Sequence, residues 1–288
     1  MSALPPGREL ARLPWRGREI HLEYEWVGVA RSAATPVVVF LHEGLGSISM
    51  WRGFPQAFCA AHGLAGFVFS RYGYGNSTPK PRDERWSPDF MHRQADEVLP
   101  ALFAAVGIER PWLFGHSDGG TIALLHAARF AVAGVVAVAP HLFVEEVSVK
   151  SIELARDAFE SSDLRSRLAK HHADPDSAFR GWNDAWLSPE FRAWNVERDI
   201  ETITSPVLAV QGVDDEYGTL EQIRAIARRV PQTVLLEIPD CGHSPHRDQP
   251  ELLSDAAGRF IAAHSTGAPA ASAVSAASAT PTGRHRPA

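Results

Sequence analysis

Six short runs of apolar residues, separated by stretches with helical patterning, set the strongest limit on how this chain can fold. Runs that are apolar at nearly every position are typical of strands buried on both faces, as in a parallel sheet covered by helices. Strands of this kind that alternate with helices predict a doubly wound α/β sheet. The runs lie at 36–42, 66–70, 111–116, 134–140, 205–212 and 233–239.

One earlier segment, residues 18–27, has a different pattern. Ile20, Leu22, Tyr24 and Trp26 alternate with polar residues, which predicts a half-buried strand at an edge of the sheet. Helices are expected in the spaces between the strands because apolar residues recur there at helical spacing. The expected helices lie at 51–63, 87–107, 121–130, 218–230 and 248–264.

Residues 141–204 interrupt the alternation of strands and helices. This segment has no strand-like run and holds polar-rich helical stretches, so we expect a helical cap inserted between two strands. The core domain is then expected at 1–140 and 205–264. Residues 265–288 are small, polar and interrupted by prolines, and we expect a disordered tail because such a segment buries little apolar surface.

Composition and charge argue against several classes of protein. The chain of 288 residues is long enough for one large domain with an insertion. Its formal net charge is −6 and it has no basic stripe, which argues against nucleic-acid binding. Cys59 and Cys241 lack metal-site spacing and suggest no disulfide scaffold. Without a run of membrane-spanning length or a signal-like start, we expect a cytoplasmic protein.

The pentapeptide GHSDG at 115–119 lies between an expected strand and an expected helix. This is the pattern G-x-S-x-G, in which a sharp turn exposes a serine and glycines remove Cβ atoms that would collide with neighbouring backbone. Gly115 and Gly119 take the glycine positions and Ser117 is the candidate nucleophile. The backbone N–H of Asp118 would be free to donate to an oxyanion.

A serine nucleophile needs a base, and the base needs a carboxylate that orients it. With the serine on a strand-to-helix turn, the expected order along the chain is Ser, then Asp or Glu, then His. The candidates should follow the late strands. His243 follows Gly242 in a turn and is the preferred base, whereas His246 is interpreted as a surface histidine. The acidic candidates after 205–212 are Asp214, Asp215 and Glu216.

With these motifs in order, the sequence resembles the α/β-hydrolase superfamily, and specifically its capped esterase and C–C hydrolase branch, over about residues 18–264. The resemblance implies a mostly parallel sheet of the eight-stranded type, flanked by helices and carrying a helical lid at 141–204. It also implies that the acid is Asp215, three residues after Gly212, with Asp214 as the alternative. A serine at the turn disfavours the relatives that use an aspartate there.

The loop LHEGLGS at 41–47 departs from the family pattern, because Glu43 occupies a position that is usually glycine. The resemblance implies that the second oxyanion donor lies here, and we favour the N–H of Gly44, with that of Asp118 as the first donor. A carboxylate aimed at an oxyanion would repel its charge, so Glu43 is expected to turn away and pair with Arg71. Two independent surface charges are the equally weighted alternative, and recognition of a cationic substrate group by Glu43 is the third.

Aromatic residues suggest an apolar or aromatic substrate of moderate size. Trp182 and Trp186 are four residues apart on an expected helix and so share a face. Glu43, Arg71, Trp51 and His141 are the other candidate substrate contacts. The tryptophan pair could equally anchor the lid to the core, which is the commoner use of paired tryptophans.

Together these observations predict a serine hydrolase that cleaves a carboxylic ester or a related acyl bond, with no metal and no organic cofactor. C–C bond hydrolase, lactonase, thioesterase and perhydrolase or haloperoxidase chemistry would use the same groups. A non-enzymatic ligand receptor on this fold is less consistent, because all three catalytic residue types are present. We expect a small-molecule substrate and no nucleic-acid or membrane partner, and leave homo-oligomer formation open.

Overall fold

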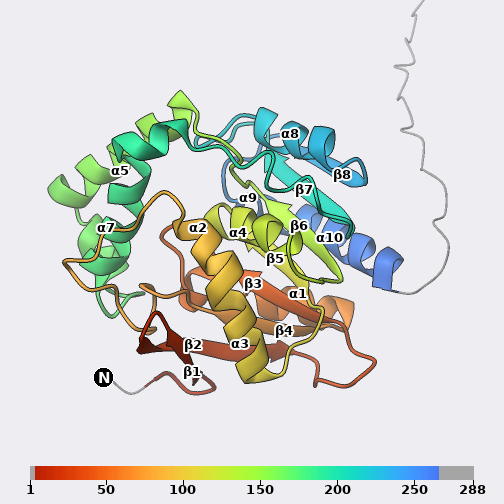
Figure 1. The fold of residues 1–288 in the computed structure, drawn as a ribbon. Helices are drawn as coiled ribbons and strands as arrows, with labels where there is room; N and C mark the ends of the chain where they lie inside the picture. Colours follow the sequence, from red (N-terminus) through yellow and green to blue (C-terminus); the bar gives the residue numbers. More distant parts are fainter. Residues whose placement is uncertain (1–3, 266–288) are drawn as a thin grey trace, which may run out of the picture.

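The computed structural model describes residues 4–265, which build a central eight-stranded sheet with helices on both faces (Figure 1). The strands lie in the order β1-β2-β4-β3-β5-β6-β7-β8, and all neighbours from β4 to β8 are parallel. The predicted fold class is therefore confirmed. The strands are β1 (Glu9–Trp15), β2 (Arg18–Gly28), β3 (Val37–Leu41), β4 (Ala65–Phe69), β5 (Trp112–His116), β6 (Gly134–Val138), β7 (Val207–Gly212) and β8 (Thr233–Ile238).

The six apolar runs form β3 to β8, and five of these strands are buried along almost their whole length. The exception is β8, where Val234 and Leu235 are exposed. The expectation of burial on both faces is wrong for this strand, because these two successive residues point to opposite faces and neither face is fully covered at this last strand of the sheet.

The first strand, β1, was not predicted. It pairs antiparallel with β2 through a two-residue turn in which Arg16 and Gly17 both have positive φ, the geometry that suits a tight hairpin. Because β1 covers its outer side, β2 is not the predicted edge strand. Its Glu23 is fully buried rather than solvated, and the carboxylate accepts hydrogen bonds from the Ser70 hydroxyl and the Asn76 N–H.

The sheet divides the hydrophobic core into two clusters, and helices cover one cluster on each face. Apolar side chains of α2, α3, α4 and α8 belong to one cluster of buried residues, and those of α1 and α10 belong to the other. Figure 1 shows α3 and α4 in front of the sheet and α1 and α10 behind it. These helices are α1 (Phe54–His62), α2 (Phe90–Arg93), α3 (Leu99–Val106), α4 (Asp118–Ala127), α8 (Glu221–Arg229) and α10 (Pro250–Ser265).

The single helix predicted at 87–107 contains an irregular turn. Between α2 and α3 the backbone forms a π-helical turn, η2 (Gln94–Val98), which directly precedes α3, whose second residue is Pro100. Proline has no N–H to continue the α-helical ladder and its ring crowds the preceding turn, which accounts for the irregular turn.

The segment between β6 and β7 is helical, as expected for 141–204. Phe159, Phe179, Trp186 and Phe191 attach it to the core on the α4 face of the sheet. In Figure 1, α5 and α7 lie together at one side of the molecule. Its elements are α5 (Glu146–Ser161), α6 (Leu164–Leu168), α7 (Pro175–Trp186) and the 3₁₀ turn η3 (Pro189–Ala193).

Two expectations concern the ends of the chain and membranes. Apart from Ser265, the last residue of α10, the tail predicted at 265–288 lies outside the described residues. Within residues 4–265, no helix combines the length and the apolar composition that crossing a membrane requires.

Candidate functional site

Ser117 occupies the sharp turn between β5 and α4. Its φ of 54° and ψ of −121° are strained for a residue with a side chain, and its N–H is held by the carbonyl of Val138 at 2.8 Å. A Cβ on Gly115 would lie 2.2 Å from the Gly119 carbonyl oxygen, and one on Gly119 would lie 2.1 Å from the Leu41 carbonyl oxygen. Both obstacles are backbone, so the steric reason predicted for the two glycines is confirmed.

The structure brings Ser117, His243 and Asp215 together in one hydrogen-bonded chain. His243 Nε2 lies 3.0 Å from Ser117 Oγ, and His243 Nδ1 lies 2.8 and 3.0 Å from the two carboxylate oxygens of Asp215. A carboxylate only accepts hydrogen bonds, so Nδ1 carries the proton and Nε2 is free to accept one from the serine. The alternative acid, Asp214, is exposed.

Asp215 is fixed in place by further donors. The Tyr217 N–H donates to one oxygen at 2.8 Å and Gln211 Nε2 donates to the other at 3.0 Å. Burial raises the pKa of Asp215, but the hydrogen bond and charge of His243 outweigh it and leave that pKa below its ordinary value. Burial lowers the pKa of His243, and the hydrogen bond and charge of Asp215 outweigh it and leave the pKa above its ordinary value.

The Glu43–Gly44 peptide is fixed by hydrogen bonds to its carbonyl oxygen. The Glu43 carbonyl accepts hydrogen bonds from Arg71 Nη2 at 2.8 Å, His42 Nδ1 at 2.7 Å and the Gly46 N–H at 3.1 Å. In a trans peptide the N–H points opposite to the carbonyl, so the Gly44 N–H is directed away from these donors. It has no acceptor within residues 4–265, and neither has the N–H of Asp118 at the first turn of α4.

The predicted ion pair between the side chains of Glu43 and Arg71 is wrong. Arg71 contacts the main chain of Glu43, and its Nη2 lies 3.9 Å from the carboxylate of Asp118. The Glu43 carboxylate instead lies 3.6 Å from His116 Nδ1 and 3.8 Å from Arg247 Nη2. Sequence alone could not show this, because the attraction of Arg71 is to a backbone oxygen that every residue has.

A cavity of about 240 Å³ opens beside Ser117. Of the candidate substrate contacts, Glu43 and Trp182 line it. A Cβ on Gly44 would lie 2.2 Å from Trp182 Nε1, so the glycine lets this tryptophan of α7 cover the loop. The complete lining is Glu43, Gly44, Leu45, His116, Ser117, Trp182, Glu216, Tyr217, His243, Ser244 and Arg247.

The remaining candidate substrate contacts do not line this cavity. Trp51 is buried in the core on the α1 face, and Arg71 lies behind the Glu43 carbonyl. Trp186 donates its indole N–H to Asp118 Oδ1 at 3.2 Å, and Nε2 of His141 lies 3.1 Å from the Tyr217 carbonyl. These four residues therefore lie around the site without facing the cavity.

The sequence also missed residues at the cavity. Glu216 and Arg247 are charged and make the lining of the cavity more polar than predicted. The sequence did offer a signal for them, because they lie close in sequence to Asp215 and His243. His246 is not the expected surface residue: it is 5% exposed, and its ring packs at a tilt against Trp51 and edge-on against His116.

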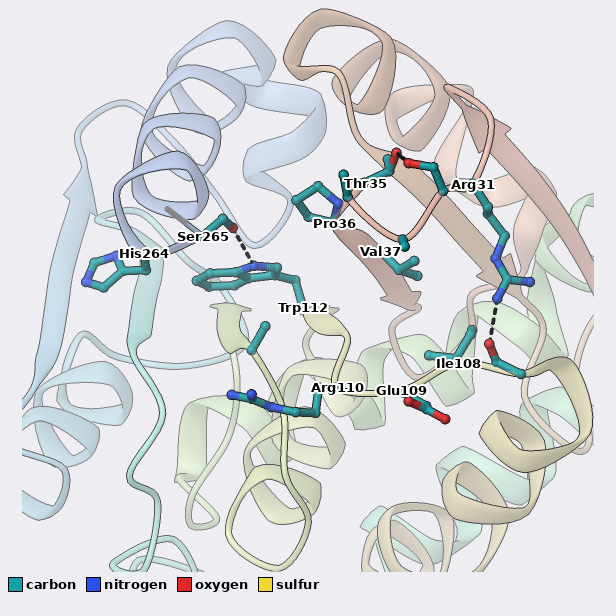
Figure 2. A pocket seen from close by; sticks show the side chains of 15 residues that line it. Arg31, Thr35, Pro36, Val37, Ile108, Glu109, Arg110, Trp112, His264 and Ser265 are labelled. Atoms are coloured by element: carbon teal, nitrogen blue, oxygen red, sulfur yellow. Dashed lines mark hydrogen bonds between the residues drawn. The ribbon is translucent and has the colours of Figure 1, made fainter. Parts of the chain in front are cut away.

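A larger cavity, about 790 Å³, lies at the opposite ends of the strands, where β3 and β5 begin (Figure 2). It is built around the first residues of β3 and β5, Val37 and Trp112, with the Trp112 indole donating to Ser265 at 3.0 Å. Ligands of open α/β sheets bind at the carboxyl ends of the strands, which is where Ser117 follows β5. We therefore assign the smaller cavity as the candidate active site. No group of three metal-ligating side chains was found within residues 4–265.

Comparison with known proteins identifies the family of this chain. Residues 38–256 match the model of the alpha/beta hydrolase family, so the chain belongs to that family and is a hydrolase of this fold. The sn-1-specific diacylglycerol lipase ABHD11 of Mus musculus is 23% identical over 259 residues, covering 80% of this chain and 82% of the lipase.

Two solved structures show the same fold. The proline iminopeptidase of Mycobacterium smegmatis has a TM-score of 0.71 and 18% identity, covering 89% of this chain and 99% of the other. A thermophilic esterase from Thermogutta terrifontis has a TM-score of 0.67 and 19% identity, covering 90% and 99%. The resemblance stated from the sequence is thus confirmed at the level of family and fold.

Proposed function

We propose that the protein hydrolyses carboxylic esters of small acids and alcohols through an acyl-enzyme on Ser117. The observation that carries this proposal is the continuous hydrogen-bonded chain from Ser117 through His243 to Asp215. It lies beside a cavity and two backbone N–H groups that have no acceptor among residues 4–265. Esterase and lipase names among the relatives support the ester as the substrate bond.

In the first half-reaction, Ser117 Oγ attacks the ester carbonyl carbon and its proton passes to His243 Nε2. The bond from the carbonyl carbon to the alcohol oxygen then breaks, and the alcohol leaves with the proton from Nε2. In the second half-reaction, His243 takes a proton from water as the water oxygen attacks the acyl carbon. The bond to Ser117 breaks, the proton returns to Oγ, and the acid is released.

The backbone N–H groups of Gly44 and Asp118 are proposed to hold the oxyanion. Both are free of acceptors within the described residues, and the Asp118 N–H lies at the start of α4, where the helix dipole favours negative charge. The segment at 141–204 is proposed to act as a lid, because Trp182 of α7 lies directly on Gly44 and lines the cavity.

A fluorophosphonate probe tests the proposed function. We expect wild-type protein to gain one covalent phosphonate, and peptide mass spectrometry to place it on Ser117. An activated serine is the group that reacts with this probe, whereas ordinary serines stay unmodified. No modification, or modification elsewhere only, would favour a ligand receptor over an enzyme.

Replacing Arg71 with methionine tests how the oxyanion donor is positioned. Arg71→Met removes one of the three donors that hold the Glu43 carbonyl, so the Gly44 N–H loses its fixed direction. Losing an oxyanion donor outright costs about 10²–10³ in kcat, and we expect misorientation to cost about 10–10², with little change in KM for 4-nitrophenyl acetate.

The double variant Arg71→Met/Asp118→Asn is the control for charge. Arg71 also lies 3.9 Å from the buried carboxylate of Asp118, which the single change leaves without its cation. If kcat stays low in the double variant, peptide orientation is the cause. Recovery of kcat on removing the Asp118 charge would contradict this role of Arg71.

A further inference from the structure

The carboxylate of Glu43 is ionised and lies at the wall of the active-site cavity. Burial alone would raise the pKa of Glu43, but its interaction with His116 is the largest opposing cause, and the balance leaves that pKa well below its ordinary range. The side chain is 17% exposed, and the residue lines the cavity that also contains Ser117. A negative charge is therefore kept beside the candidate nucleophile.

This carboxylate has hydrogen-bonding capacity that the described residues leave unused. His116 Nδ1 and Arg247 Nη2 lie 3.6 and 3.8 Å away, which is ion-pair range but longer than a hydrogen bond. Within residues 4–265, the hydrogen bonds to Glu43 end on its carbonyl oxygen, and neither oxygen of its carboxylate accepts one. Largely buried carboxylates normally accept several, so a donor is expected to come from the cavity.

His116 and Arg247, whose nitrogens lie within 4 Å of the Glu43 carboxylate, place it on the side of His243. The other ring nitrogen of His116, Nε2, lies 2.7 Å from the His243 carbonyl. Arg247 follows shortly after His243 in the chain, within the short helix α9 (Pro245–Asp248). In the proposed mechanism His243 hands its proton to the departing alcohol, so the alcohol portion of the substrate also lies on this side. Glu43 is therefore closer to the alcohol than to the acyl chain.

A second acid, Glu216, lines the same cavity. One of its oxygens accepts a hydrogen bond from the His243 N–H at 3.1 Å. Glu43 and Glu216 together place two carboxylates against one guanidinium, that of Arg247, in the cavity wall. This charge balance favours a substrate group that donates hydrogen bonds or is positively charged, and it disfavours a carboxylate there.

We propose that Glu43 binds a hydrogen-bond-donating group, an ammonium or a hydroxyl, on the alcohol portion of the ester. This inference rests on the proposed ester hydrolysis and adds the chemical class of the alcohol. The hydrogen bond is made to a side-chain oxygen of Glu43, while the main chain of the same residue stays fixed by Arg71 and His42.

Pairs of esters that differ only in the donor provide the test. For the ammonium, 2-(dimethylammonio)ethyl butyrate is compared with 3-methylbutyl butyrate, in which C–H replaces N–H⁺. For the hydroxyl, 2-hydroxyethyl butyrate is compared with propyl butyrate. Ethyl glycolate and ethyl propionate form the third pair, with the hydroxyl on the acyl side. The measured quantity is the ratio of kcat/KM within each pair, near neutral pH.

We expect wild-type protein to prefer the donor-bearing alcohol at least about tenfold in one of the first two pairs, and to show no such preference in the third. Glu43→Gln keeps the size of the side chain and removes its charge. The ammonium preference should fall to about one, because kcat/KM should fall more for 2-(dimethylammonio)ethyl butyrate than for 3-methylbutyl butyrate.

Three results would overturn the inference. They are equal rates within both alcohol pairs in the wild type, a preference on the acyl side only, and an equal loss on all esters in Glu43→Gln, which would indicate a purely structural residue. Glu190→Gln, an exposed acid in η3, is the matched control and should leave every ratio unchanged. If wild-type protein hydrolyses none of the esters, the proposed function fails as well, whereas hydrolysis without selectivity defeats only this inference.

Discussion

Ser117→Ala is expected to lower kcat for ester hydrolysis by about 10⁶, because the three residues of such a chain act as a unit and none replaces the nucleophile. Ser117 has the only hydroxyl within hydrogen-bond distance of His243 Nε2 in the described residues, at 3.0 Å. A residual acceleration of about 10³–10⁴ over water would come from substrate binding and the oxyanion donors. Steady-state kinetics with 4-nitrophenyl acetate measure the loss.

Ser244→Ala is the matched control for this substitution. Ser244 lines the same cavity and precedes α9, but its side chain makes no cap hydrogen bond. Its variant should retain kcat within about threefold, since the Ser244 side chain takes no part in the proposed chemistry. A Ser117→Ala protein that keeps substantial activity with an unchanged unfolding temperature would exclude the acyl-enzyme mechanism.

The nucleophile turn was predictable because its constraints are local. Gly115 and Gly119 face backbone carbonyls at distances that no Cβ tolerates, and the sequence carries this requirement in five consecutive residues. The order Ser117, Asp215, His243 was predictable for a related reason. In a parallel sheet the carboxyl ends of strands meet at one edge, so residues that follow β5, β7 and β8 converge.

The surroundings of Glu43 could not be predicted in the same way. Opposite charges in two loops suggested an ion pair, yet Arg71 binds the Glu43 carbonyl and the carboxylate turns to the other side. Opposite charges in a sequence can suggest only which side chains pair with each other. Here the contacts of Arg71 and Glu43 depend instead on the direction of the Glu43–Gly44 peptide. The prediction for His246 was wrong for a similar reason, because its ring is covered by Trp51, which lies far away in the sequence in the 3₁₀ turn η1 (Ile48–Trp51).

The strand β1 shows a third limit of sequence reasoning. Ala11, Leu13 and Trp15 are its buried positions, and the alternation is visible once the strand is known. Arg12 and the strand-breaking residue Pro14 obscure it, and Pro14 is tolerated because β1 is an edge strand with one neighbour. Missing β1 also made β2 appear to be the edge.

Asp215→Asn is expected to lower kcat by about 10⁴ through the wrong histidine tautomer. Tyr217 donates its backbone N–H to one oxygen, and Gln211 donates to the other while also holding the Gly218 carbonyl. An asparagine NH₂ therefore faces a donor in either orientation. When it faces His243 Nδ1, it stabilises the tautomer with the proton on Nε2, which cannot accept the proton of Ser117.

The pH profile separates this effect from simple damage to the fold. Neutral His243 is the base, so activity is present above its pKa and is lost as the pH falls through it. Asp215 raises that pKa, so its loss should move the acid limb of kcat/KM to lower pH as well as lower the plateau. Asp214→Asn, the exposed neighbour, should leave both the plateau and the limb unchanged. If Asp214→Asn instead gives the larger loss, the orienting acid has been assigned to the wrong aspartate.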